Sequence, residues 1–345
     1  MGPPRRATRV AVVLGTVAAV ALIAVPAAIA AFGARAQSAG NTVSAAPDFT
    51  PPAIAATVIA KTQGGTTGFV HKGGTYFAYA NVAADTGSPA SGLSTVKANL
   101  GEITAGQTEA VLTAITPVTI GGVTYNFRSA ELTASSVVEG SRSYTVTAID
   151  NAGNARTVNG SATVDNVVPT AADVQAANGG GTVGRAEERD LITYTFSESI
   201  EPQSILGGWS GTATSVTVRI YDNGLLGLGG DDQLQIYDAS NASQLPLGTV
   251  DLGRTDYAVS VLGGLIGSPY RFLNSTMTMT GNTVTIVFGT YSSTILLDSE
   301  RSTAGGTGTM TWTPEPESKP APYDRAGSRM STTPVTESGP TDKEF

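Results

Sequence analysis

Acidic and amide side chains in glycine-rich turns are the residues of this 345-residue chain with the clearest capacity for chemistry. Asp222, Asn223, Asp231 and Asp232 fall in one predicted loop between two short segments of strand character. Several oxygen ligands presented by turns suit a hard cation such as Ca²⁺. The same composition also describes a metal-free hairpin loop, because Asp and Asn cap their own backbone. We therefore expect a structural loop with no required cofactor, and keep these four residues as weak metal candidates.

Catalytic chemistry has few candidates in the sequence. The chain has no cysteine, which excludes disulfides, thiolate metal sites and thiol nucleophiles. His71 is the single histidine, so a Ser-His-Asp arrangement would have to use it, but no nucleophile-elbow motif accompanies it. A glycosidase would need two carboxylates across a cleft, and Glu198 and Glu201 are close in sequence but have the character of strand-end and turn residues. We expect a protein that is not an enzyme, with no catalytic residues.

Aromatic residues leave a second class of function open. Trp209, Trp312 and the tyrosines could form a platform on which sugars stack. With only two tryptophans in the chain, packing in a core is the simpler expectation. An exposed row of aromatic side chains would favour a carbohydrate-binding module, whereas aromatics confined to the cores would favour adhesion or scaffolding.

Net charge argues against nucleic acid as a partner. The first 36 residues carry four arginines and no acid, so the remaining 16 basic residues stand against all 28 acidic ones, a net charge of −12. A basic stripe with interleaved aromatics is missing from the sequence, and duplex or single-strand binding is therefore a poor hypothesis.

The segment from Ser143 to Thr170 organises the chain. Alternation over residues 143–149 predicts a half-buried strand. Asp150-Asn-Ala-Gly-Asn154 predicts a turn, residues 157–164 predict a second strand, and Pro169 ends the unit. Tyr-x-Val-x-Ala-x-Asp-x-Ala-Gly-Asn followed by Val-Asp-Asn-x-x-Pro resembles the last two strands of bacterial immunoglobulin-like domains, which recur in tandem on secreted surface proteins.

The resemblance and the strand pattern together predict an all-β fold of two tandem immunoglobulin-like β-sandwich domains. We expect the first sandwich over residues 48–167 and the second over 168–345. In the second, Tyr323-Asp-Arg-Ala-Gly-Ser328 repeats the pattern of Ile149-Asp-Asn-Ala-Gly-Asn154. By that correspondence a closing strand should follow at about residues 329–337, with Pro334 at a sheet edge.

The resemblance also raises a second calcium candidate. Tandem surface domains of this kind sometimes bind calcium at their junction, where Asp150, Asn151 and Asp165 are the sequence candidates. Turn capping explains Asp150 and Asn151 equally well, and we prefer that interpretation. The run Gly227-Leu-Gly-Gly-Asp-Asp-Gln-Leu234 resembles one imperfect calcium-binding nonapeptide, but such motifs act as stacked repeats.

The N-terminus predicts export. A basic start, an uncharged apolar run from Val10 to Phe32 and the small-x-small site Ala34-Arg-Ala36 indicate a signal peptide over residues 1–36. A linker over 37–47 would follow. The run is also long enough to span a bilayer, so an uncleaved anchor is the alternative and would be the only contact with a membrane. Residues 31–52 resemble the start of actinobacterial exported proteins whose signal peptides are like those of extracellular fibre subunits.

These observations predict a secreted or cell-surface protein with a structural or adhesive role. A carbohydrate-binding module and an extracellular fibre subunit are the alternatives. The partner is expected to be a surface glycan or a protein, and the sequence does not identify which.

Overall fold

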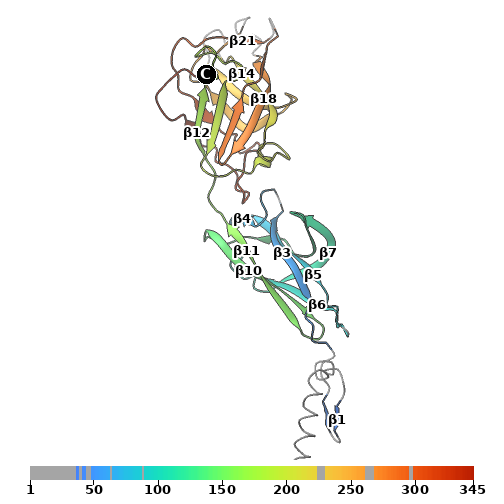
Figure 1. The fold of residues 1–345 in the computed structure, drawn as a ribbon. Coiled ribbons are helices and arrows are strands. Elements are labelled where there is room, and N and C mark those ends of the chain that lie inside the picture. The colour runs from blue at the N-terminus through green and yellow to red at the C-terminus, as the bar shows by residue number, and fades with distance from the viewer. Residues whose placement is uncertain are drawn as a thin grey trace, which may run out of the picture.

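The computed structural model describes residues 36–38, 41–43, 48–62, 64–87, 89–223, 230–260, 268–294 and 298–345. Within these ranges the chain has no α-helix and a single 3-10 turn, Pro202–Ser204. None of its described helical segments is long and apolar enough to cross a membrane. The predicted signal peptide lies outside the described residues, apart from Ala36. Figure 1 shows two β-rich units following one another along the chain.

A short strand pair precedes the first unit, β1 (Ala36–Ser38) with β2 (Asn41–Val43). The first unit itself forms one continuous path of hydrogen-bonded strands, in the order β3-β5-β8-β7-β6-β10-β11-β4, with β9 on β5. Its strands are β3 (Ala53–Lys61), β4 (Phe69–Val70), β5 (Thr75–Ala83), β6 (Leu93–Asn99), β7 (Ala110–Ile120), β8 (Val123–Ser129), β9 (Leu132–Thr133), β10 (Gly140–Asp150) and β11 (Ala155–Val164).

The strands of this path lie in two layers, and the β7–β8 hairpin has a register shift between Ala114 and Val118. The inner face of β5 packs against β6 and β10, to which it is not hydrogen-bonded, in one buried cluster. The opposite face of β5 contributes Tyr79 to a second cluster. This strand is therefore packed on both of its faces. The short β4 pairs in parallel with the last strand, β11, as an immunoglobulin-like first strand does when it crosses between sheets.

Tyr144 and Val146 occupy the positions where antibody-type domains place a tyrosine and a cysteine. Both are buried, and Val146 packs in the main cluster of the first unit. The Tyr144 ring covers Gly160, its cross-strand partner, where any Cβ would overlap the ring. Because the chain has no cysteine, apolar packing occupies the place of that disulfide.

The second unit has the strand order β12-β13-β19-β18-β14-β15-β16-β22-β23, with β20 on β18 and a separate β17–β21 pair. Its strands are β12 (Ala171–Ala177), β13 (Leu191–Phe196), β14 (Thr214–Tyr221), β15 (Gln233–Asp238), β16 (Gln244–Asp251), β17 (Ala258–Ser260), β18 (Tyr270–Thr280), β19 (Thr283–Val287), β20 (Thr290–Ser292), β21 (Ser299–Arg301), β22 (Thr311–Thr313) and β23 (Val335–Thr336).

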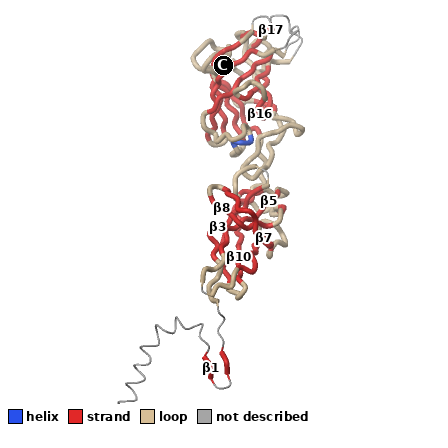
Figure 2. Tube along the Cα trace, turned by 90° about the vertical axis from the view of Figure 1, so that its right-hand side faces the viewer, coloured by secondary structure: helices blue, strands red, loops and turns tan. Residues whose placement is uncertain are grey.

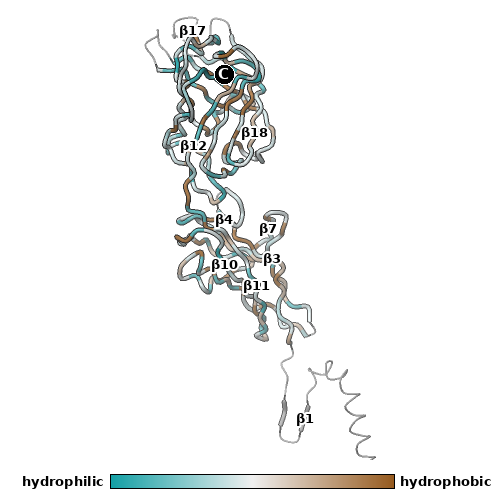
Figure 3. Tube along the Cα trace, turned by 60° about the vertical axis from the view of Figure 1, so that its left-hand side comes forward, coloured by the Kyte–Doolittle hydropathy of each residue, from teal (hydrophilic) through white to brown (hydrophobic). Residues whose placement is uncertain are grey.

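Trp312 is the centre of the second core. The Tyr194 and Phe196 rings meet it edge-on at centroid distances of 5.0 and 5.2 Å, and its indole N–H donates to the Leu247 carbonyl at 2.6 Å. Because β13 and β22 are far apart in the strand order, these contacts join two different layers of strands. Figure 3 shows apolar segments running through the strands of this unit. The predicted all-β class of two tandem immunoglobulin-like sandwiches is confirmed.

The C-terminal segment completes the second sandwich. Val335 pairs with Trp312 in β22, and the region predicted as a closing strand also contains the buried Met330. The Ser338 N–H donates to Asp173 Oδ1 at 2.8 Å, which ties this segment to the far edge of the sheet near β12. Phe345 is buried as well, against Tyr257 and Phe288.

We expect a chain that ends at Pro322 to lose cooperative unfolding of the second domain while the first domain melts normally. The truncation removes the partner of β22 and exposes one side of the core. Thermal unfolding followed by circular dichroism measures both transitions. Met330→Ala should lower the stability of the second domain by about 2–5 kcal/mol, and the exposed Thr341→Ala should change neither transition. Two unchanged transitions in the truncated chain would contradict the structural role.

Candidate functional site

The linker between the two sandwiches is fixed at both of its ends. On the first domain, the Asp165 N–H donates to the Val70 carbonyl at 2.9 Å, and the Lys72 N–H donates to Asn166 Oδ1 at 2.6 Å. On the second, the Pro169 carbonyl accepts a hydrogen bond from the backbone of the C-terminal segment. Figure 2 shows the narrow connection. Only the middle of residues 165–170 is left without such contacts, and Val167 and Val168 are exposed there.

Lys61 joins the two domains directly. Its ammonium group donates to three backbone carbonyls, those of Thr66 at 2.6 Å, Phe69 at 2.9 Å and, in the second domain, Arg325 at 2.8 Å. Burial lowers the pKa of Lys61 to about 8, and the nearby carboxylate of Asp324 opposes this shift. The lysine thus brings a positive charge to a junction that is otherwise rich in carboxylates.

Three of those carboxylates gather in the junction triad, Asp165, Glu198 and Asp324. One oxygen of each lies within 4.8 Å of the others. Burial raises the pKa of Glu198 to about 7, and the negative charges of Asp165, Asp324 and Glu139 add to the shift. Burial also raises the pKa of Asp324. Oxygen Oδ2 of Asp324 and oxygen Oε1 of Glu198 are buried and have no hydrogen-bond partner.

In metal-free buffer, raising the pH from 5 to 8 should lower the melting temperature of the second domain. The folded-state pKa of Glu198 lies above its ordinary value of 4.5, so the folded state holds its proton more tightly. That stabilisation is complete below about pH 4.5 and is lost as the pH rises through about 7. Glu198→Gln should show a smaller pH dependence, and the exposed Glu317→Gln should match the unmodified chain. Equal pH dependence in both variants would show that Glu198 does not titrate in this way.

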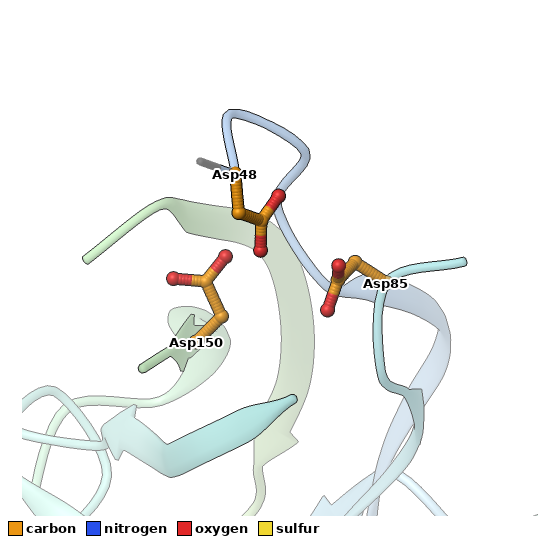
Figure 4. Close-up of side chains that lie close together, drawn as sticks. All are labelled: Asp48, Asp85 and Asp150. Carbon is orange, nitrogen blue, oxygen red and sulfur yellow. The ribbon is translucent and has the colours of Figure 1, made fainter. Parts of the chain in front are cut away.

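A second group of carboxylates, the distal triad, lies at the other end of the first domain (Figure 4). It consists of Asp48, Asp85 and Asp150, all buried, with one oxygen of each within 4.8 Å of the others. Hydrogen bonds from Ser91 and then Thr50 hold the pKa of Asp48 below its ordinary value. Asp85 has no hydrogen-bond partner on either oxygen, although its side chain is only 8% exposed.

The sequence candidates Asp150, Asn151 and Asp165 do not form one site. Asp150 begins the turn before β11 and Asp165 follows the end of that strand, so the ten residues of β11 separate them by roughly 33 Å. Asp150 accepts hydrogen bonds from Asn154, which is the turn capping that the sequence indicates. Each aspartate belongs to a different triad.

The loop that contains the four weak metal candidates has two aspartates that accept backbone hydrogen bonds. Asp232 Oδ2 accepts the N–H groups of Tyr257 and Ala258, both at 2.8 Å, and Asp222 Oδ2 accepts the Ser260 N–H at 2.8 Å. Burial raises the pKa of Asp232 to about 7. These two residues fasten the loop to β17. Asn223 is exposed and Asp231 half-buried, and residues 224–229 lie outside the described part of the chain.

The remaining sequence candidates are scattered. His71 lines a groove of about 360 Å³ at the domain junction, together with Lys72, Asn166, Val168, Ser328 and Arg329, and its Nδ1 lies 3.0 Å from the Lys72 carbonyl. Glu201 accepts the Thr66 hydroxyl at 2.7 Å across the junction. Trp209 and Trp312 are buried in the second domain.

A third acidic group, Glu337, Asp342 and Glu344, lies in the C-terminal segment. Burial raises the pKa of Glu344 to about 8, and Glu337 and then Asp342 raise it further. The backbone N–H of Glu344 donates to the Tyr257 hydroxyl at 2.7 Å. This group connects the end of the chain to the second core.

Sequence reasoning missed Asp48 and Asp85 as site residues, considered Glu198 only together with Glu201, and treated Asp324 as part of a repeated turn. Each lies in a turn of ordinary composition, far in sequence from its partners. The repeated Asp-x-Ala-Gly turn offered a signal for two of the six acids, because Asp150 and Asp324 open it in the two domains.

No protein-family model and no curated protein matches the chain. Solved structures with a similar arrangement include the N-terminal Ig1-2 module of Drosophila receptor protein tyrosine phosphatase DLAR, at 11% identity over 79% of this chain and 94% of that chain, with a TM-score of 0.20. The fibronectin(III)-like modules of Clostridium thermocellum CbhA share 14% identity over 55% and 88%, with a TM-score of 0.23. The C-terminal domain of the Streptococcus agalactiae AgI/II polypeptide BspA shares 13% over 84% and 98%, with a TM-score of 0.21. At such low scores, the fold assignment rests on strand order and packing.

Proposed function

We propose that this chain is a non-catalytic structural or adhesive protein of the cell surface or extracellular space. The observation that carries the proposal is the pair of immunoglobulin-like sandwiches joined by a short linker with hydrogen bonds on both sides. An arrangement of this kind can space a binding surface away from an attachment point. The apolar run and the small-x-small site in the N-terminal sequence support the proposed location.

The placement of aromatic side chains supports adhesion or scaffolding over sugar binding. Of the tryptophans, tyrosines and phenylalanines in the described ranges, Phe49 alone is exposed, and both tryptophans are buried. A sugar-stacking platform needs several exposed rings on one face. The extracellular fibre subunit remains an alternative within the structural class.

The environment of His71 supports a non-catalytic role. Its imidazole lies beside the backbone carbonyl of Lys72, and no hydrogen bond within the described ranges links it to a carboxylate or a serine. A triad-type nucleophile requires both of those links.

On a glycan array, the full chain should give no saturable signal, whereas the immobilised chain should retain a protein from an extracellular or surface fraction. The reason is that both tryptophans are buried and that, among the described aromatic residues, Phe49 alone is exposed. Trp209→Ala and Trp312→Ala should therefore lower thermal stability, and both variants should give no saturable glycan signal, like the unmodified chain. Saturable glycan binding by the folded chain would favour the carbohydrate-binding alternative.

The exported form should begin at or near Gln37, because Ala34-Arg-Ala36 follows the apolar run as a signal-peptidase site does. N-terminal sequencing of protein from the culture medium and from the membrane fraction tests this expectation. Ala36→Leu should block processing, while Ala46→Leu, outside the site, should not. A membrane-bound protein that starts at Met1 would identify the segment as an anchor.

A further inference from the structure

The junction triad and the distal triad occupy equivalent positions in the two domains. In each, one acid lies a few residues before the first long strand, Asp48 before β3 and Asp165 before β12. A second acid lies two residues beyond the strand that pairs with it, Asp85 after β5 and Glu198 after β13. Both triads therefore lie at the end of a sandwich where its first strand begins.

The third acid of each triad opens the same five-residue turn. Asp150 and Asp324 each accept, on Oδ1, the N–H of the residue four positions later, at 2.8 and 2.7 Å. In both turns the backbone N–H of that aspartate donates to the carbonyl of the same residue at 3.1 Å. The glycines have φ angles of 91° and 88°, a conformation that residues other than glycine seldom adopt. The equivalence thus extends to the hydrogen bonds.

Both triads contain buried carboxylate oxygens that the protein leaves without a partner. Neither oxygen of Asp85 has a hydrogen bond, and Asp324, with a side chain 1% exposed, leaves Oδ2 unpaired. Among the described residues, none of the six carboxylates takes part in an ion pair. Figure 4 shows the carboxyl groups of the distal triad turned toward one another. A buried carboxylate is costly in its charged form when it has neither a hydrogen bond nor an ion pair, so an arrangement that occurs twice points to a positive partner.

We propose that each triad binds one divalent cation of the calcium type, through Asp48, Asp85 and Asp150 at the distal end and through Asp165, Glu198 and Asp324 at the junction. Six to eight oxygen ligands suit Ca²⁺, and three carboxylates supply up to six, with backbone carbonyls and water available for the rest. The donor sets contain only oxygen, which selects a hard cation over zinc or copper.

The two sites have different consequences for the chain. At the junction, Asp165 follows the last strand of the first domain, whereas Glu198 and Asp324 belong to the second, so a bound cation ties the domains together. At the distal end, Asp48 brings the segment that enters the first sandwich against the turn at Asp150. The inference is independent of the proposed adhesive role, because it depends only on the carboxylates.

Calorimetric titration of the chelator-treated full chain with CaCl₂ at pH 7.5 tests the proposal. We expect two Ca²⁺ per chain, with dissociation constants on the order of 10⁻⁴–10⁻³ M, as in extracellular calcium modules. Asp85→Asn and Glu198→Gln should each leave one site, and the double variant should leave none. The exposed Glu131→Gln and Glu317→Gln are the matched controls and should keep both sites.

Thermal unfolding with CaCl₂ or EDTA gives a second readout that needs no variant. Calcium should raise both transitions of the unmodified chain, since a ligand that binds only the folded state stabilises it. Absence of binding by the unmodified chain would overturn the proposal, as would two sites remaining in the double variant. Loss of binding in Asp231→Ala with Asp232→Ala, but not in Asp85→Asn or Glu198→Gln, would assign calcium to the loop and equally overturn it.

Discussion

Apolar packing between two layers of strands, without any covalent cross-link, is the interaction on which both domains depend. In the first domain it relies on small residues, and Tyr144 fits over Gly160 because that position has no side chain. In the second domain Trp312 fills the space between layers. Such cores end where the strands end. The turns at one end of each sandwich then bring three carboxylates together.

Local pattern was sufficient to predict most of the fold. Alternation identified β10, and the Asp-x-Ala-Gly cluster identified the turn that follows it. The C-terminal segment was harder, because only Val335 and Thr336 form a strand there and buried side chains such as Met330 hold the rest. The alternation of apolar and polar residues gives little information about a segment that is held in place mainly by side-chain packing.

The carboxylate triads could not be predicted in the same way. Some turn aspartates only cap their own backbone, and others also face two further acids. The local sequence is the same in both cases. Asp150 does both, since it accepts the Asn154 N–H and lies in the distal triad. What distinguishes the two cases is which turns meet at the end of a sandwich, and that depends on strand order. Comparing the two domains within this chain supplies part of the missing information.

The carboxylates of the junction can be balanced by the ammonium of Lys61, by protons or by a cation. Lys61 directs its hydrogen bonds to carbonyl groups, so it acts on Asp324 only at longer range. A proton on Glu198, whose pKa lies at about 7, and a cation among the three acids are alternative states of the same oxygens. Because binding a cation there requires the proton to leave, acidification must weaken the junction site. At the distal end, hydrogen bonds lower the pKa of Asp48, so protons compete less for its carboxylate. The two sites, although equivalent in position, should therefore differ in their response to pH.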